Sequence, residues 1–413
     1  MANTFQTTQY ILDEVFIRFV NYLNFAKVAN RNLEGDFKGL KYATGQTINY
    51  RLEERYLGGE GATATSEARV QVIRPLTIDK QFHTMVEFDG FELTFDRARD
   101  EPYLDMMLNP RAKTLANKAE KFIATDNFQK QVYQAVGVPG SGTVDFPLIT
   151  VADAYMTELG IPEDGNRFFA NAPRVSAQLS QGLSSLFNNT VNRGALMDGF
   201  VGHLSGFDFF KTNFLTRQIA GAGAGGAAVA GFIAAGTVTN GPITGGSTIS
   251  VTGLPAATAV FNEGDSIEID EAAGVFMVNP LTYEPLVQRA QFVVTADVIS
   301  DGAGNADIPV SPAIVVSGAR QNISAAIPNG ATVQLAADHN VSLAFHNQSV
   351  VFAAPAIKEL KGGVEAVTSY SDLYKMAMTY SLGADIRNYV QLDRIDLICG
   401  VSINPEFAVR VRS

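Results

Sequence analysis

The chain has 413 residues, of which 46% are hydrophobic and 18% are charged, and its formal net charge at pH 7 is −11. This length allows two or three domains with ample core. The acidic balance excludes nucleic-acid binding through a broad basic surface, because duplex affinity rests on Lys and Arg side chains that neutralise phosphates. The one cysteine, Cys399, excludes an internal disulfide, so we expect a reducing compartment and a buried, unreactive thiol.

The negative charge is concentrated in one part of the chain. Residues 221–343 carry 10 acidic residues and two basic ones, Arg289 and Arg320, and thus supply −8 of the −11. This segment is predicted to be a separate unit. The run 219–236 reaches the length of a membrane span, but it is mostly Gly and Ala and has too little apolar area to favour insertion. We interpret it as a linker, and we expect no membrane association and no signal peptide.

Residues 8–29 are predicted to form an amphipathic helix, capped by Thr7 or Thr8. Its apolar stripe includes Phe16 and Phe19 at helical spacing. Further apolar residues lie off that stripe, so more than one face of the helix is apolar. Two interpretations stay open: an ordinary core helix, or an arm that uses Phe16 and Phe19 to contact a neighbouring subunit.

Two strands, 46–57 and 69–88, are predicted from alternating apolar and polar residues. The segment 58–65 between them is rich in Gly, Ala and Thr, which indicates the tip of a long hairpin. A two-stranded ribbon of this length is not stable alone in water, so we expect it to lie on another structure, such as a second copy of the chain. The alternative is a solvated charged edge that resists aggregation. The candidate interface residues of this hairpin are Arg55, Glu60, Glu67, Arg69 and Arg74.

The longest predicted helix spans residues 109–136. Asn109 caps it, Pro110 occupies its first position, where a helix tolerates proline, and a Gly-x-Pro sequence ends it. Its apolar residues form one stripe up to Phe122 and a second stripe from Phe128 onward. At about 100° per residue the two stripes lie on nearly opposite sides. A helix that changes face in this way packs against different partners at its two ends, which suits a spine across the molecule.

Helices and strands alternate after the spine. A helix capped by Thr150 is predicted to end at Gly160, residues 168–170 form a short buried strand, and Pro173 begins another helix. Residues 200–215 are rich in Phe and return as extended structure. This alternation predicts a compact α+β lobe.

The acidic segment 221–343 contains several strand-like runs separated by Gly and Asn/Asp turns, the pattern of a small barrel or sandwich. The mixed pattern resumes at about Phe345, with a buried strand at 350–353 and near-continuous apolar strands at 390–392 and 395–403. The chain therefore enters a β-domain and returns to its host. We predict an α+β fold in which a small β-domain is inserted into a discontinuous host domain.

Sequence signatures of catalysis are nearly absent. There is no Walker-type Gly-Lys-Ser/Thr, no G-x-S-x-G and no C-x-x-C, and the G-x-G-x-x-G at 221–226 lies in a Gly/Ala tract where chance produces it. The four histidines lack metal-ligand spacing, and the carboxylates of 268–271 fit a solvated strand face. We therefore expect no enzyme activity, no cofactor and no metal site. An enzyme would need a deep pocket converging on His203 or His346 with nearby carboxylates.

The order of these parts resembles the major capsid proteins of tailed bacteriophages, whose fold is shared with herpesvirus capsids and encapsulin shells. Within that family the chain is similar to the short-tailed-phage branch, whose coat protein carries an inserted β-barrel domain. The resemblance is carried by LANKAE at 115–120, GFD at 206–208, FNEGDSI at 261–267, QFVV at 291–294 and GVSINPE at 400–406.

The resemblance implies a tailed-phage capsid fold with an N-terminal arm, an extended hairpin loop, a long spine helix, an axial domain and an inserted small β-barrel. The implied bounds are 1–45 for the arm, 46–100 for the hairpin loop and peripheral strands, 101–146 for the peripheral domain with the spine helix, 147–220 and 344–390 for the axial domain, 221–343 for the inserted barrel and 391–413 for the closing strands.

The implied function is a major capsid protein that self-assembles as hexamers and pentamers into an icosahedral shell around phage double-stranded DNA. The implied partners are other copies of the chain, a scaffolding protein and a portal, with no sequence-specific binding of nucleic acid. The implied location is the virion, after assembly in the host cytoplasm, with the spine transmitting a rotation when the shell expands.

The sequence departs from some relatives in two ways. Residues 42–79 contain no Lys, so the crosslink that some relatives form from a hairpin Lys is not expected. About 45 residues precede the hairpin, which favours a separate scaffolding protein over a long cleavable N-terminal one. The alternative function is a non-capsid structural or adhesion protein whose β-rich insertion binds a receptor, and the missing secretion signal and disulfides weigh against it.

Overall fold

The computed structural model describes residues 8–31, 47–61, 66–67, 69, 71–89, 101–186, 203–359, 364–371 and 375–413. The chain divides into two compact units. The first contains Met1–Leu52, Ile73–Ala124 and Val350–Ile403, and the second contains Glu53–Val72, Thr125–Ser349 and Asn404–Ser413. Residues 350–390 thus group with the hairpin strands, whereas the sequence placed them with 147–220.

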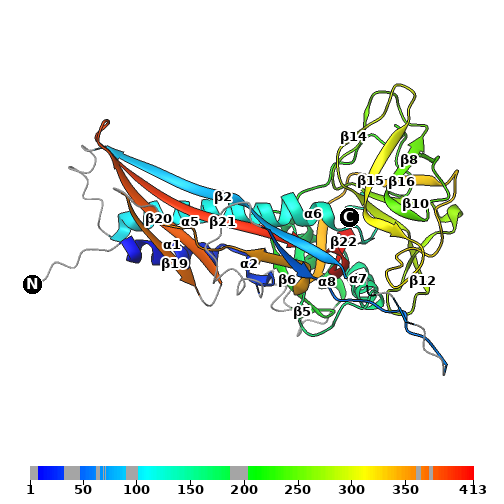
Figure 1. Cartoon of the computed structure of the whole chain (residues 1–413), viewed down its shortest axis with the longest axis horizontal. Helices are drawn as coiled ribbons and strands as arrows, with labels where there is room; N and C mark the ends of the chain where they lie inside the picture. Colours follow the sequence, from blue (N-terminus) through cyan, green and yellow to red (C-terminus); the bar gives the residue numbers. More distant parts are fainter. Residues whose placement is uncertain are drawn as a thin grey trace, which may run out of the picture. The chain divides into compact units, whose positions relative to one another are not determined.

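The first unit is built on one antiparallel sheet (Figure 1). Its strand order is β1 (Thr47–Arg51), β2 (Ile73–Asp89), β21 (Val390–Ile403), β20 (Met376–Asp385) and β19 (Glu365–Ser371), and β18 (Val350–Ala353) also pairs with β21. The two apolar runs predicted at 390–392 and 395–403 form one strand. At Gly400, opposite Ile78, a Cβ atom would lie 2.4 Å from the Thr77 carbonyl oxygen. Glycine is required there because the two backbones approach so closely.

The described residues of this unit contain the helices α1 (Thr8–Asn21), α2 (Phe25–Val28) and α5 (Glu101–Lys121). The single helix predicted over 8–29 is therefore broken at Tyr22–Asn24, and its proposed cap Thr7 lies outside the described residues. Helix α1 packs on α5, β19 and β20. Ser369 on β19 donates a hydrogen bond of 2.7 Å to Asp13 on α1.

The predicted spine differs from the observed one at both ends. Helix α5 begins at Glu101 and runs through Pro110, so the prediction that Pro110 starts the helix was wrong. An internal proline removes one backbone hydrogen bond, and the helix continues on both sides of it. A π-helix, Phe122–Phe128, follows, and the short α6 (Gln129–Gln131) ends the spine; the chain continues to strand β3 (Ala135–Val136).

The π-helix lies where the sequence predicts the apolar face to change. A π-turn closes hydrogen bonds to the fifth residue instead of the fourth, and the extra residue rotates later side chains by about 100° about the axis. Both predicted stripes are buried: Leu108, Ala112, Leu115, Ala119 and Phe122 before the change, and Phe128, Val132, Ala135 and Val136 after it. The boundary between the two units falls within the π-helix.

The second unit contains a mixed sheet covered by helices. The strand order is β3, β22 (Ala408–Arg412), β17 (Val341–His346), β4 (Arg167–Asn171), β6 (Phe207–Lys211) and β5 (His203–Leu204). Helix α7 (Phe146–Glu158) is capped by Asp145, whose carboxylate accepts the Leu148 N–H at 3.1 Å, and not by Thr150 as predicted. Helix α8 (Pro173–Leu186) begins at the predicted proline.

The inserted segment forms the predicted small barrel, a closed sheet of six strands. These are β10 (Ser266–Ile269), β13 (Gln291–Val294), β15 (Ala306–Val315), β8 (Gly245–Thr252), β7 (Phe232–Val238) and β16 (Thr332–Ala336). Two short sheets, β9 (Ala259–Phe261) with β14 (Val298–Ile299) and β11 (Phe276–Val278) with β12 (Pro285–Arg289), complete it.

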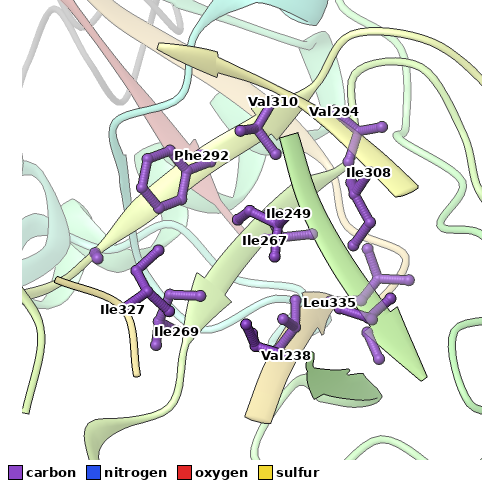
Figure 2. Packing of buried hydrophobic residues seen from close by; sticks show 14 of the residues in the cluster. Val238, Ile249, Ile267, Ile269, Phe292, Val294, Ile308, Val310, Ile327 and Leu335 are labelled. Carbon is purple, nitrogen blue, oxygen red and sulfur yellow. The ribbon is translucent and has the colours of Figure 1, made fainter. Parts of the chain in front are cut away.

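Aliphatic side chains and Phe292 fill the barrel interior (Figure 2). The prediction that 219–236 is only a linker was wrong, because its last residues form strand β7. Its glycines permit close packing: a Cβ atom at Gly221 would lie 2.3 Å from the Val260 carbonyl oxygen. The small residues of this run therefore allow its backbone to pack closely against the barrel wall.

Candidate assembly surfaces

The N-terminal helices pack into the core of the first unit. Phe16 and Phe19 are 6% and 0% exposed, so they are core residues of their own subunit. The interpretation that they contact a neighbouring subunit is therefore wrong for this structure, because their rings are already covered. Among the side chains of α1 that the structure describes, Ile17 is a large apolar one that is 59% exposed.

The break between α1 and α2 is held by Glu120 of the spine. Its carboxylate accepts hydrogen bonds of 2.9 to 3.0 Å from the backbone N–H groups of Asn24, Phe25 and Ala26. These N–H groups begin helix α2 and have no partner inside the helix. A buried carboxylate in the spine therefore caps a helix about 95 residues earlier in the chain. The sequence analysis noted Glu120 only as part of a family motif and missed this role.

Substituting Glu120 removes this cap. We expect Glu120→Ala to lower the free energy of unfolding by about 3 kcal/mol or more, because each buried N–H left without an acceptor costs roughly 1–3 kcal/mol. Lys118→Ala on the exposed side of the same helix is the control and should change stability by less than about 0.5 kcal/mol. Urea unfolding monitored by circular dichroism measures both, and equal midpoints for the two variants would contradict the capping role.

The same carboxylate gives the first unit a defined pH response. Burial raises the pKa of Glu120 above its ordinary 4.5, although the three N–H groups oppose the shift. The folded chain therefore keeps this proton to higher pH than the unfolded chain, and the associated stability is lost as pH rises through the folded-state pKa. We expect the parent chain to lose stability relative to Glu120→Gln as pH rises from about 4.5. The difference between the urea midpoints of the two proteins is measured over a pH series. This difference should not change with pH if Glu120 keeps an ordinary pKa.

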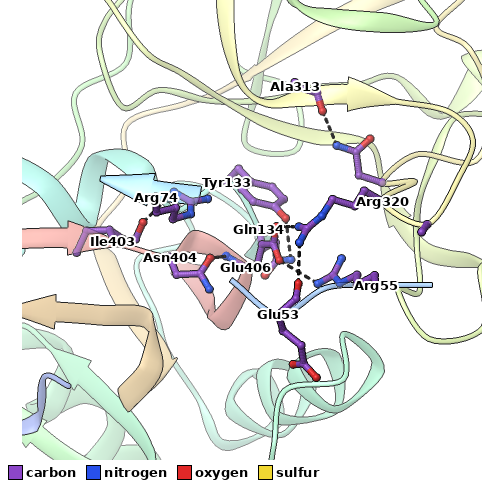
Figure 3. A network of polar contacts seen from close by, with 12 residues as sticks. Glu53, Arg55, Arg74, Tyr133, Gln134, Ala313, Arg320, Ile403, Asn404 and Glu406 are labelled. Atoms are coloured by element: carbon purple, nitrogen blue, oxygen red, sulfur yellow. Dashed lines mark hydrogen bonds and ion pairs between the residues drawn. The ribbon is translucent and has the colours of Figure 1, made fainter. Parts of the chain in front are cut away.

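The base of the hairpin loop is held by an ion cluster within the second unit (Figure 3). Glu406 lies in the short 3-10 helix Pro405–Phe407 and accepts from Arg55 at 2.9 Å with one carboxylate oxygen and from Arg320 at 3.4 Å with the other. Arg320 also donates to the Glu53 carbonyl oxygen at 2.8 Å. Arg55, a predicted interface residue, is therefore engaged within its own subunit.

The other charged hairpin residues that were predicted to lie at an interface have separate surroundings. Arg69 pairs with Glu54 at 2.8 Å, and Glu67 accepts the backbone N–H of Leu57 at 2.9 Å. Arg74, in the first unit, donates to the Ile403 carbonyl oxygen at 3.0 Å. Glu60 is exposed. The structure thus uses Arg69, Glu67 and Arg74 to shape the hairpin.

Exposed apolar residues mark a turn that the sequence analysis did not single out. The turn joins β20 to β21 and displays Ile386, 91% exposed, and Tyr389, 77% exposed. Asp385 fixes it by accepting from the Arg387 backbone N–H and the Asn388 side chain, both at 2.9 Å. Two large apolar side chains that share one exposed turn make it a candidate protein–protein contact. In the sequence, this surface could have been found from two large apolar residues that lie within an otherwise polar turn.

Two buried arginines tie the last strand to the barrel. Arg410 donates to the Gly264 carbonyl oxygen at 2.9 Å and to that of Gln129, and Arg412 pairs with Glu268 at 2.6 Å. Burial lowers the pKa of Arg410 to about 10. Glu268 is 4% exposed and is paired with Arg412, so the prediction that it lies on a solvated strand face was wrong. Buried ion pairs of this kind add little net stability, and their main effect is to specify which elements pack together.

The histidines form no catalytic constellation in the described residues. His203 meets Asp208 at 2.9 Å on the exposed β5–β6 hairpin, and buried His346 meets Asp164 at 3.0 Å. Hydrogen bonds from Asn166 and His346 lower the pKa of Asp164 to about 2. Each of these two histidines thus has a carboxylate neighbour, in a pair that joins local turns and strands.

No group of three or more His, Cys, Asp or Glu side chains suited to a metal ion occurs among the described residues. None of the helices in the described ranges is both long enough and apolar enough to cross a membrane. Cys399 is buried, and burial raises the pKa of its thiol.

The hairpin with its charged loop, the spine helix, the mixed sheet and the inserted closed barrel define a coat protein with a tailed-phage capsid fold. The family model described as "P22 coat protein - gene protein 5" matches residues 1–410, and the chain belongs to this family. The α+β fold class and the capsid resemblance predicted from the sequence are thereby confirmed. No curated protein matches the sequence.

Solved structures similar to the chain come from phage capsids. The Mycobacterium phage Che8 structure has 13% identity and a TM-score of 0.47, over 100% of this chain and 94% of that chain. The capsid of cyanophage P-SCSP1u has 10% identity and a TM-score of 0.42, over 100% and 90%. The capsid of Ralstonia phage GP4 has 9% identity and a TM-score of 0.40, over 94% and 88%. The family assignment rests on the match over residues 1–410.

Proposed function

We propose that this chain is a major capsid protein that self-assembles as hexamers and pentamers into an icosahedral shell enclosing phage double-stranded DNA. The observation that carries the proposal is membership of the coat-protein family over residues 1–410. The acidic balance of −11 is compatible with a container, because a shell needs no tight contact with its DNA.

Three of the surfaces that the fold leaves apolar and exposed are proposed to join subunits. They are the β20–β21 turn with Ile386 and Tyr389, the outer face of α1 with Ile17, and the hairpin loop with Tyr56 and Leu57. Exposed apolar groups at defined turns and loops lower the free energy of association when a neighbouring copy covers them. The charged hairpin residues Glu60, Glu67 and Arg69 are proposed to set the register of these contacts.

The partners and setting follow from the same proposal. Copies of the chain are the main partner, and a separate scaffolding protein and a portal are proposed to direct closure of the shell in the host cytoplasm. The mature location is the virion, and the shell later expands with the spine carrying a rotation. The protein acts as a structural component and not as an enzyme.

Sedimentation velocity tests self-association directly. The full-length chain alone and the chain co-expressed with its phage's scaffolding protein are compared at the same concentration. Rapidly sedimenting particles of uniform size are expected with the scaffolding protein. A chain that stays a monomer under every condition, including high concentration and mildly acidic buffer, would overturn the proposal.

A further inference from the structure

The segment that leaves β1 has little regular structure to hold it. Residues 52–60 form neither helix nor strand, and Tyr56 and Leu57 are about half exposed. The direction of such a segment is set by its side-chain and backbone contacts, because no ladder of strand hydrogen bonds fixes it. The contacts between residues 53–57 and the rest of the second unit are therefore informative.

These contacts converge on the inserted barrel. Arg320 donates to the Glu53 carbonyl oxygen at 2.8 Å, and Tyr283 directs its hydroxyl at the carbonyl oxygens of Ala319, at 3.3 Å, and Tyr56, at 3.5 Å. Residues 221–343 contain ten acidic residues and two basic ones, and Arg320 is one of the two basic residues. The other, Arg289, pairs with the exposed Glu271 within the barrel. One of the two basic residues of the insertion thus serves a segment outside it.

Glu406 completes the contact from a third part of the chain. It lies directly before β22 and binds Arg55 and Arg320 with its two carboxylate oxygens. Asn404 accepts the Glu406 backbone N–H at 3.4 Å and so positions the carboxylate (Figure 3). The three charged side chains are between 19% and 29% exposed. Breaking the cluster therefore admits water without opening a hydrophobic core.

We propose that Arg320, Glu406 and Arg55 form a latch by which the inserted barrel sets the direction of the hairpin loop in the unassembled subunit. This inference rests on the proposed function. The role of the latch is to orient the loop before it meets a neighbouring copy. Presetting a loop lowers the entropy that association must overcome. The barrel is thus a positioning element for a surface that lies outside it.

Distances between spin labels in the unassembled full-length chain test the latch. Labels are placed at Leu57→Cys on the loop and Val287→Cys on the exposed face of β12, and Cys399 is buried and does not compete. We expect one narrow distance population in the parent. In Arg320→Ala the ratio of narrow to broad populations should fall at least about tenfold, because the contacts with Glu53 and Glu406 are both lost and a single hydrogen bond to a charged group already accounts for about that factor.

Matched variants separate the latch from general damage. Arg289→Ala removes the other basic residue of the insertion and should leave the distribution narrow. Arg55→Ala breaks the latch from the loop side and should broaden it even if Arg320→Ala fails to fold. An unchanged narrow distribution in the folded latch variants would overturn the proposal. The measurement needs no assembly, so a broadened distribution supports the latch even in a chain that forms no shells.

Discussion

A carboxylate at Phe122 or at Val132 is expected to prevent recovery of folded protein. Phe122 lies in the first unit, where its ring meets Phe82 at a centroid distance of 6.1 Å and Lys80 at 5.9 Å. Val132 follows the spine in the second unit and is fully buried. A buried carboxylate in such surroundings costs several kcal/mol, partly offset by Lys80 at position 122 only, against a total stability of about 5–15 kcal/mol. Loss of the apolar contacts adds roughly 3 kcal/mol.

Refolding yield after dilution from urea measures this effect. Phe122→Asp and Val132→Asp should both give a yield near zero, because one disrupts the apolar stripe that ends at Phe122 and the other disrupts the stripe that begins at Phe128. Lys118→Asp, exposed on the same helix, is the control and should refold like the parent. Normal refolding of either core variant would show that one half of the spine does not pack as described.

Replacing Ile386 and Tyr389 by aspartate is expected to abolish shell formation and to leave the subunit folded. Both side chains are almost free of contacts within the subunit, so their removal costs little stability. In a shell they are proposed to be covered by a neighbouring copy, where burying one such side chain contributes roughly 1.5–3 kcal/mol. That contribution recurs at every repeat of the contact, and two carboxylates in its place would be desolvated or repelled.

Two measurements separate assembly from folding for this double variant. Thermal unfolding should match the parent within about 2 °C, and sedimentation with the scaffolding protein should show no large particles. Val151→Asp, at an exposed apolar position on α7, is the control and should still assemble. Shells formed by the double variant at the parent's yield would exclude the turn as an assembly surface.

Local patterns predicted most of the elements. Alternation identified β1 and β2, and strand-like runs between turns identified β8, β10, β13 and β15 of the barrel but not β7 or β16. The change of apolar face between Phe122 and Phe128 coincided with the π-helix. Helix ends were less well predicted. Pro110 is an ordinary start signal, yet the helix runs through it, and Asp145 outcompetes Thr150 as a cap. Tertiary packing decides between such nearly equal local alternatives.

The contacts that position the surfaces could not be predicted, because they join distant parts of the chain. Glu120 caps a helix 95 residues earlier, and Arg55 meets Glu406 across 351 residues. Nothing in the spacing of one residue specifies such a partner. Phe16 and Phe19 failed as interface candidates for the same reason, since only the packed structure shows that their apolar stripe is covered within the subunit. Exposed Ile386 and Tyr389 equally need the fold to distinguish them from core residues.

Electron microscopy of the chain co-expressed with its scaffolding protein tests the central claim most directly. The account predicts closed particles of icosahedral symmetry whose reconstructed density shows hexamers and pentamers of this chain, each subunit with a spine helix and an inserted barrel. Open fibres, amorphous aggregate or discrete small oligomers from protein that is folded by circular dichroism would contradict it.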